Sequence, residues 1–279
     1  MLNNHVVRIQ CSDQKGLIAR ISGVLYENNH NVLIMKEFVE EDSNTFFARI
    51  ELSGELNIAK LHQELNVILP EDAVITVHPR QKKKILIMVT KEHHCLTDLL
   101  IRHHFKEINA DIQAVIGTYE GLQEICTRMS IPFILIRHEN KSREAFEAGL
   151  RDQIKEYDPD FIVLAKFMRI LSPWFVSFYE NRIINIHHSF LPAFVGAHPY
   201  KQAYDRGVKI IGATAHFVTH TLDDGPIISQ KTIEVNHEYV LKDMIEAGHE
   251  IEKAVLADAL KKVLHDQVFV VNNRTVILD

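Results

Sequence analysis

Five short apolar runs, separated by helical patterns, recur after residue 84 and constrain the fold more than any other feature of the chain. The runs cover 85–89, 110–116, 133–136, 161–164 and 183–187. Near-continuous apolar runs of this length are typical of parallel strands that are buried on both faces. Because strands that alternate with helices form doubly wound sheets, we predict a mostly parallel α/β domain over 85–279. Its site should lie at the carboxyl ends of the strands.

Two further strands are predicted at 210–218 and 227–235, on either side of a loop that contains Asp223. A long amphipathic helix follows at 240–264.

The first 80 residues have a different pattern, with strands and helices on a shorter scale. Alternating or apolar stretches predict strands, and recurrence at helical spacing predicts helices. The expected order is strand 6–10, helix 17–25, strands 32–38 and 45–52, helix 58–68 and strand 73–77. This βαββαβ order predicts a ferredoxin-like domain over 1–80. Pro79 and the basic run after it predict a linker at 81–84.

The composition excludes several classes of protein. Of the 279 residues, 46% are apolar and 24% are charged, which is ordinary for a globular protein. The net charge of −6 gives no general electrostatic footprint for nucleic acid. No apolar run reaches the ~20 residues that a membrane helix needs. Cys11, Cys95 and Cys126 are widely spaced and odd in number, so we expect no disulfide framework and a cytoplasmic location.

The run from Ile184 to Pro192 ends one of the predicted strands with polar side chains. Asn185 and His187 are two residues apart, so on a strand they project from the same face. An amide can donate to a developing oxyanion, an imidazole can move a proton, and the carboxylate of Asp223 can orient the imidazole or accept a proton. For Asn185 or His187 alone, a strand end whose side chains cap loops is the simpler interpretation. The convergence of three roles favours a catalytic site.

These residues also carry a family resemblance. The motifs Asn185-Ile186-His187, Ser189-Phe-Leu-Pro and Leu222-Asp-x-Gly-Pro resemble the core of the folate-dependent formyltransferase family over 84–279. The resemblance implies that Asn185, His187 and Asp223 surround the formyl group of 10-formyltetrahydrofolate. The stretch 164–173 resembles the folate-binding loop of that family. The substrate-binding positions implied by the resemblance are Phe167, Met168, Arg169, Ile170, Leu171, His216 and Gly225.

The segment after the strand at 85–89 bears on the acceptor of the formyl group. Transferases that act on a phosphorylated amine hold the phosphate with a glycine-rich loop at this place, where a helix N-terminus suits an anion. Here the segment 90–95 contains no glycine and brings the negative charge of Glu92. We therefore expect water as the acceptor. The chain then resembles the hydrolase branch of the family, with the folate as substrate and no tightly bound cofactor.

Two alternatives stay open at this point. One is formyl transfer to an amine, and the other is a regulatory protein that senses folate or an amino acid. The sequence does not decide whether His187 or Asp223 is the general base, because the two groups are coupled.

The histidines raise separate questions. His188 would face away from His187 on a strand, where it could brace a loop or close the acceptor space. The adjacent pairs among the 17 histidines cannot easily share one ion, and no His-Glu-x-x-His is present, so we expect no metal site.

The N-terminal part resembles the ACT domain, a small regulatory module, through the segment from Asp13 to Leu17. Gly16 permits a tight bend near a ligand, and Asp13 could cap the following helix. Turn chemistry explains Asp13 and Gly16 equally well, so effector binding at Asp13, Gly16 and Leu17 stays an expectation. The resemblance implies a homo-oligomer such as a tetramer, since exposed sheet edges commonly pair. It also implies a formate supply for purine synthesis, tuned by methionine and glycine.

Overall fold

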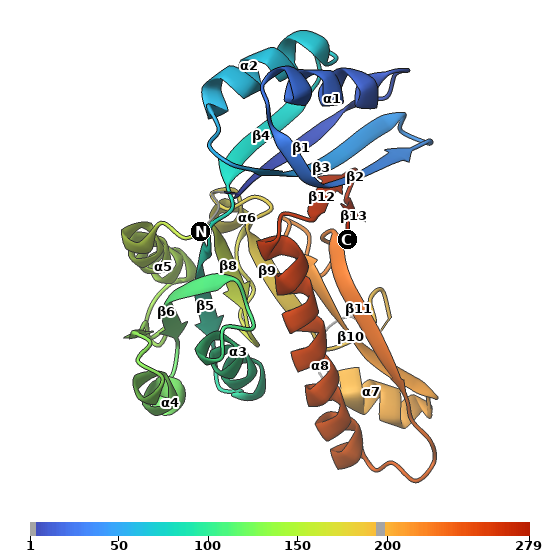
Figure 1. Ribbon diagram of the computed structural model, residues 1–279. Helices are drawn as coiled ribbons and strands as arrows, with labels where there is room; N and C mark the ends of the chain where they lie inside the picture. Colours follow the sequence, from blue (N-terminus) through green and yellow to red (C-terminus); the bar gives the residue numbers. More distant parts are fainter. Residues whose placement is uncertain (1–3, 194–198) are drawn as a thin grey trace. The chain divides into compact units, whose positions relative to one another are not determined.

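The computed structural model describes residues 4–193 and 199–279 and divides the chain into two compact units (Figure 1). The N-terminal unit spans Met1–Gln81, Asp266–Phe269 and Val276–Asp279, and its first three residues, part of the domain predicted at 1–80, lie outside the described residues. The C-terminal unit spans Lys82–His265 and Val270–Thr275. Strand β5 already begins at Lys83, so the last two residues of the basic run at 81–84 belong to a strand.

The N-terminal unit has the predicted βαββαβ order. Its elements are β1 (Asn4–Ser12), α1 (Leu17–Glu27), β2 (Asn31–Glu40), β3 (Thr45–Ser53), α2 (Ile58–Ile68) and β4 (Val74–Pro79). The sheet has the order β2-β3-β1-β4, and β1 pairs antiparallel with both β3 and β4. The ferredoxin-like prediction is therefore confirmed.

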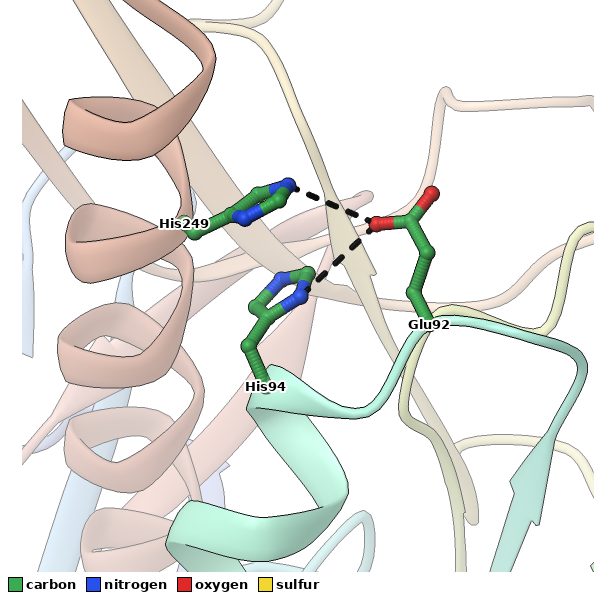
Figure 2. Close-up of side chains that lie close together, drawn as sticks. All are labelled: Glu92, His94 and His249. Carbon is green, nitrogen blue, oxygen red and sulfur yellow. Dashed lines mark ion pairs between the residues drawn. The ribbon is translucent and has the colours of Figure 1, made fainter. Parts of the chain in front are cut away.

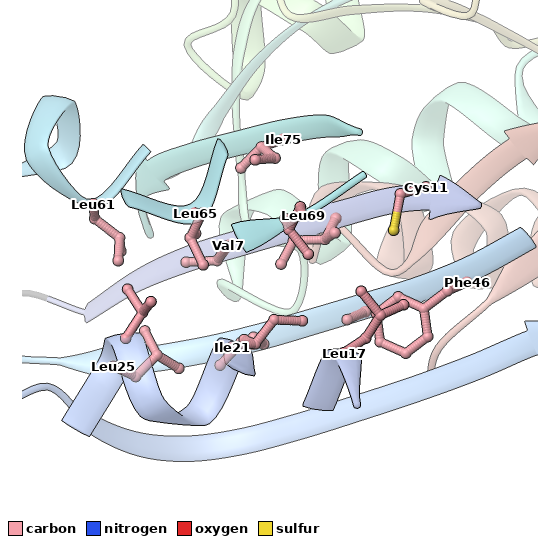
Figure 3. Close-up of a cluster of buried hydrophobic side chains, with 14 of the residues drawn as sticks. Val7, Cys11, Leu17, Ile21, Leu25, Phe46, Leu61, Leu65, Leu69 and Ile75 are labelled. Atoms are coloured by element: carbon pink, nitrogen blue, oxygen red, sulfur yellow. The ribbon is translucent and has the colours of Figure 1, made fainter. Parts of the chain in front are cut away.

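Helices α1 and α2 pack their apolar faces on one side of this sheet (Figure 3). Leu17, Ile21 and Leu25 recur every four residues along α1, so they lie on one face, and all three are buried. Leu61 and Leu65 do the same on α2. The core of this unit is thus made by two amphipathic helices over an antiparallel sheet.

The C-terminal unit contains the predicted sequence of alternating strands and helices. Its elements are β5 (Lys83–Val89), α3 (His94–His104), β6 (Ala110–Gly117), a 3-10 turn (Glu120–Leu122), α4 (Gln123–Arg128), β7 (Phe133–Leu135), α5 (Arg143–Tyr157), β8 (Phe161–Leu164), α6 (Pro173–Val176), β9 (Ile183–His187), α7 (Pro199–Arg206), β10 (Ile210–Phe217), β11 (Ile227–Glu234) and α8 (Leu241–Leu264). A short hairpin, β12 (Val268–Val271) and β13 (Arg274–Ile277), follows.

The large sheet has the strand order β11-β10-β9-β8-β5-β6-β7. Strands β5 to β9 run parallel, whereas β10 and β11 are antiparallel to their neighbours, so the mostly parallel sheet is confirmed. From β5 the chain builds outward through β6 and β7 and then returns to β8 on the other side. The order reverses between β5 and β8, which is the place where such folds bind ligands.

Helices cover both faces of this sheet. Leu86 and Met88 belong to a buried cluster that contains side chains of α5 and α6. Because side chains alternate along a strand, Ile85 and Ile87 face the other side. There α8 packs along β10 and β11 and contacts α3 and α7 (Figure 1). Among the described residues, no helix is long and apolar enough to cross a membrane.

Candidate active site

Strands β9 and β10 bring an amide and two imidazoles to one face of the sheet. In this antiparallel pair Asn185 lies opposite His216, and His187 lies opposite Thr214. Residues directly opposite each other share a face. The Asn185 amide nitrogen Nδ2 lies 3.2 Å from Nε2 of His216. The pairing register thus joins two predicted site residues that are 31 positions apart in the chain.

The hydrogen bonds of His216 fix its tautomer. Its Nδ1 lies 2.8 Å from the carbonyl oxygen of Phe217, and a carbonyl can only accept, so Nδ1 carries the proton. Burial lowers the pKa of His216, which keeps the ring neutral. Its Nε2 therefore accepts from the Asn185 amide. The ring holds the donor end of Asn185 at the site.

His187 and Asp223 form the second half of the site. The imidazole Nδ1 lies 3.3 Å from the carboxylate Oδ1 of Asp223. Burial alone would raise the pKa of Asp223, but the hydrogen bond and charge of His187 outweigh it and hold that pKa below its usual value. Nε2 of His187 is buried and has no hydrogen-bond partner among the residues that the structure describes. A buried nitrogen of this kind is free to take a proton from a reacting group.

The three predicted catalytic residues line one cavity of about 450 Å³. The loop Phe167–Leu171 lines it as well, as do Lys166, His188 and His216 and the segment 218–223. The structure therefore brings together almost every residue that the sequence singled out for catalysis or substrate binding in this unit. The cavity lies at the carboxyl end of β9, as the strand-end argument predicts.

The loop 166–171 is held at both ends. The Thr90 hydroxyl donates to the Lys166 carbonyl at 2.7 Å, and Nη2 of Arg143 donates to the Ile170 carbonyl at 2.9 Å. Between these anchors the side chains of Met168 and Ile170 are 56% and 62% exposed. Apolar side chains held open beside a cavity are suited to a flat aromatic ligand.

A second groove of about 410 Å³ adjoins the cavity and shares the loop Met168–Leu171 and Arg143 with it. Lys141, Arg169 and His138 also line this groove, and Phe146 forms part of its apolar wall. Two guanidinium groups and an ammonium outnumber the one carboxylate in the lining, that of Glu147, so the groove is positive on balance and suits carboxylates.

Gly225 and His188 differ from expectation. Gly225 is not among the residues that line the cavity; a Cβ there would lie 1.7 Å from the Phe217 carbonyl oxygen, so the glycine permits close backbone packing behind Asp223. His188 follows the end of β9, and its ring lies 5.2 Å from that of His187 beside the same cavity. The expectation that His188 faces away from His187 is wrong because the strand ends before it. Burial and the Lys166 ammonium lower the pKa of His188 to about 4.

A buried polar network next to the cavity was not predicted. The Glu252 carboxylate accepts from the Tyr200 hydroxyl at 2.6 Å and lies 2.8 Å from His94 Nε2 and 3.1 Å from the Lys166 ammonium. These charges outweigh the effect of burial and hold the pKa of Glu252 well below its usual value. The sequence does contain a signal, since Glu252 falls on the buried stripe of α8 with Gly248 and Val255.

Among residues 4–193 and 199–279, two groups of side chains have the donor spacing of a metal site. They are Glu92, His94 and His249, and His94, Cys95 and Glu252. In the first group His94 comes from α3 and His249 from α8 (Figure 2). The sequence argument considered only histidines that are adjacent in the chain, so it did not cover this group. The His94 and His249 rings stack at 3.9 Å with only 13° between their planes, so one ion cannot lie in both planes. The Lys166 ammonium is also 3.6 Å from the same Glu92 oxygen. The arrangement of Glu92, His94 and His249 does not suit a metal ion.

The predicted effector residues lie in the N-terminal unit. Gly16 has φ 89° and begins α1, as a tight bend requires. Leu17 is buried in the core. The Asp13 amide donates to the Asn44 carbonyl, but no side chain of the described residues caps α1, so the suggestion that Asp13 caps this helix is wrong. The glycine N-cap turns the chain before the Asp13 carboxylate can reach the helix end.

Comparisons with known proteins point to one family. A family model described as formyl transferase matches residues 83–260. A formyltetrahydrofolate deformylase of Haemophilus influenzae is 49% identical over 278 residues and covers 100% of both chains. The crystal structure of a formyltetrahydrofolate deformylase from Pseudomonas syringae superposes with a TM-score of 0.95 at 35% identity, covering 100% of this chain and 95% of that one. A glycinamide ribonucleotide transformylase from Symbiobacterium toebii matches 71% of this chain and 95% of its own, with a TM-score of 0.68 at 29% identity.

Proposed function

The chain belongs to the formyl transferase family, and we propose that it hydrolyses 10-formyltetrahydrofolate to formate and tetrahydrofolate with water as the formyl acceptor. The observation that carries this proposal is the convergence of Asn185, His187 and Asp223 on one cavity beside the loop 167–171. The full-length match to proteins named formyltetrahydrofolate deformylase supports hydrolysis over transfer.

Asn185 supplies the oxyanion donor. Its amide nitrogen donates one N–H to Nε2 of His216, which leaves the second N–H for the formyl oxygen. When water adds to the formyl carbon, negative charge develops on that oxygen and the hydrogen bond strengthens. A donor held in place before the reaction stabilises the transition state without reorganisation.

His187 and Asp223 move the protons. Water attacks the formyl carbon while the unpartnered Nε2 of His187 takes one of its protons. Nδ1 of the resulting imidazolium faces the Asp223 carboxylate, which orients the ring and stabilises its charge. The imidazolium then returns a proton to N10 as the C–N bond breaks. Formate and tetrahydrofolate leave, and the atoms balance with one water consumed.

The folate lies along the loop 166–171 in this proposal. The pterin packs against the apolar walls near Phe167 and Leu171 and bonds to the backbone, with His216 shaping the pocket floor. The adjoining groove, with Arg143, Arg169 and Lys141 in its lining, suits the negatively charged glutamate tail. No further cofactor is required by this chemistry.

Formyl transfer to an amine is the alternative. Against it, the segment after β5 offers no glycine-rich phosphate loop and carries Glu92, whose side chain is 40% exposed. A phosphorylated acceptor would meet a like charge there. The matched transformylase structure also covers 71% of this chain, whereas the matched deformylases cover its whole length.

We further propose a regulatory, ACT-like role for the N-terminal unit and a homo-oligomer. Edge strand β2 exposes Val32, Leu33, Ile34 and Phe38, each between 39% and 47%. An exposed apolar edge strand is commonly covered by a second copy.

Methionine or glycine would act through the Gly16 bend. Three buried cysteines without disulfides suit the cytoplasm, where the formate would serve purine synthesis.

Asp223→Asn tests the proposal. The amide keeps the size of the side chain but cannot stabilise an imidazolium, so kcat for formate release should fall by about 100- to 10,000-fold with thermal stability retained. Asp224→Asn is the matched control, because that neighbouring carboxylate is exposed and does not line the cavity. A wild-type kcat in Asp223→Asn would refute the assigned role.

A further inference from the structure

The buried polar network lies at the carboxyl ends of β5 and β8, where the strand order of the sheet reverses. Folds of this kind usually leave a ligand crevice at that point. The Thr90 hydroxyl ties the two strand ends together through the Lys166 carbonyl. Lys166 itself has φ 62°, a left-handed conformation that is uncommon for a residue with a side chain. Side chains of this protein therefore occupy the place where a ligand would be expected.

The network has an inner layer of groups that are almost completely buried. Glu252 is 0% exposed, Lys166 3%, His94 6% and Tyr200 7%. Glu252 joins the other three, since both of its oxygens accept hydrogen bonds or ion pairs. The four groups come from α3, α7, α8 and the end of β8, so the network ties these elements together behind the cavity.

An outer layer lies over the buried groups, and Figure 2 shows its two members, Glu92 and His249, beside His94. His249, which is 31% exposed, stacks on His94 at 3.9 Å between ring centroids. One oxygen of Glu92 lies 3.6 Å from His249 Nε2, 3.6 Å from the Lys166 ammonium and 3.7 Å from His94 Nδ1. Two half-exposed side chains thus cover the inner layer from outside.

Stability alone does not account for this arrangement. Removing a charge from water costs several kcal/mol per ion, and well-packed apolar residues of similar volume are often as stable or more stable. Lys166 is also one of the residues that line the cavity with Asn185 and His187. An ammonium has three N–H donors, and the carboxylates of Glu252 and Glu92 engage at most two of them. Within the described part of the chain, one donor is thus left for a water molecule at the edge of the cavity.

We propose that this network is the acceptor-side wall of the active site: it fills the crevice against organic amines and holds the attacking water through Lys166. The inference rests on the proposed hydrolysis. An apolar wall would exclude amines equally well, but only a polar wall can also hold a water molecule in place. The network determines which acceptor enters and where the water lies. Its other members hold Lys166, Lys166 holds the water, and none of them contacts the formyl group in this proposal.

The test measures how the enzyme divides the formyl group between water and a small amine. Wild type and variants receive 10-formyltetrahydrofolate with a fixed concentration of hydroxylamine or glycinamide, and formate and formylated amine are quantified. His249→Ala opens the outer layer at a half-exposed position, and Glu252→Ala opens the inner layer. Each should raise the ratio of formylated amine to formate at least about tenfold, the scale on which removal of a packing group changes discrimination.

The matched control is Glu250→Ala. This carboxylate lies two residues before Glu252 on the same helix, but it is 73% exposed and pairs with Lys253. The ratio of formylated amine to formate in Glu250→Ala should equal that of wild type. Lys166→Met keeps the length of the side chain and removes its charge, so it should lower kcat for formate release while the Kd for tetrahydrofolate changes less than about threefold, a small free energy.

Three results would overturn the inference. One is an unchanged ratio in His249→Ala and Glu252→Ala when both release formate. Another is wild-type kcat in Lys166→Met. The third is amine formylation by the wild type as fast as formate release. If Glu252→Ala does not fold, Tyr200→Phe takes its place, because it removes only the hydroxyl that bonds Glu252. Failure of the proposed function is distinguishable, since the wild type would then release no formate in the amine-free reaction.

Discussion

Substitution of Gly225 by alanine perturbs the site from behind, without touching a reacting group. A Cβ at this position would lie 1.7 Å from the Phe217 carbonyl oxygen and 3.2 Å from Nδ1 of His216. Ordinary contacts begin at 3.4 Å, so the two backbone segments must part by about 1.7 Å. The Phe217 N–H donates to the Pro226 carbonyl at 2.9 Å, which prevents an easy shift. The strain must therefore move the loop that carries Asp223.

The size of the effect follows from this overlap. Overpacking typically lowers the free energy of unfolding by about 1–3 kcal/mol and occasionally by more. We expect a value near the top of this range, because the clash is with backbone atoms. A loss of about 3 kcal/mol lowers Tm by roughly 6–12 °C for a unit of this size. A displacement of about 1 Å at a catalytic group can lower the rate about 100-fold. We expect Gly225→Ala to lower kcat by about that factor.

The assay combines formate release, thermal unfolding and the Kd for tetrahydrofolate. Gly149→Ala is the matched control: this glycine lies within α5, and a Cβ there would meet nothing within 4 Å. Its replacement should leave kcat unchanged and stabilise the helix by up to about 1 kcal/mol. A wild-type kcat in Gly225→Ala would refute the view that this packing positions Asp223. An unchanged Tm would refute the steric argument itself.

Three further predictions concern the oxyanion, pH and assembly. Asn185→Ala should lower kcat about 100- to 1000-fold with little change in the Kd for tetrahydrofolate, as measured by single-turnover kinetics and titration. Burial and the Lys166 ammonium lower the pKa of His188 to about 4, below the ~6.5 of an unfolded chain. The unfolded state therefore binds the proton first, and wild type should lose up to about 3 kcal/mol of stability as the pH falls from about 6.5 to 4. Urea unfolding across this range should show a smaller loss of unfolding free energy in His188→Gln than in wild type. The same dependence of that free energy on pH in both proteins would contradict the assignment to His188. Ile34→Glu with Phe38→Glu places charge on the exposed edge strand β2 and should yield monomers by light scattering, whereas an unchanged mass would exclude this edge as the interface.

The sequence was sufficient for most of the fold because the periodicities are strong. The apolar run Ile85–Val89 is typical of a doubly buried strand. Ile21, Val24 and Leu25 recur at helical spacing, and the three-residue step from Ile21 to Val24 does not stay on one face of a strand. The antiparallel direction of β10 relative to β9 could not be read in this way. The direction of a strand depends on the edge of the sheet at which the chain enters, and the periodicity of apolar residues does not indicate that edge.

The site was predictable where its residues lie close in the chain. Asn185 and His187 share a face by strand alternation alone. The bond from Asn185 to His216 depends on the β9–β10 register, which is a tertiary property. The network around Glu252 was missed because a lone charge on a long amphipathic helix is ordinarily solvent-exposed. Its position on the stripe with Gly248 and Val255 was the available signal.

The most direct test of the central claim is formate release from 10-formyltetrahydrofolate by the purified wild-type enzyme, in ¹⁸O-labelled water and without any amine. Hydrolysis predicts one formate for each tetrahydrofolate, with one labelled oxygen in every formate. Formyl loss that appears only after an amine is supplied, or formate without the label, would contradict the account.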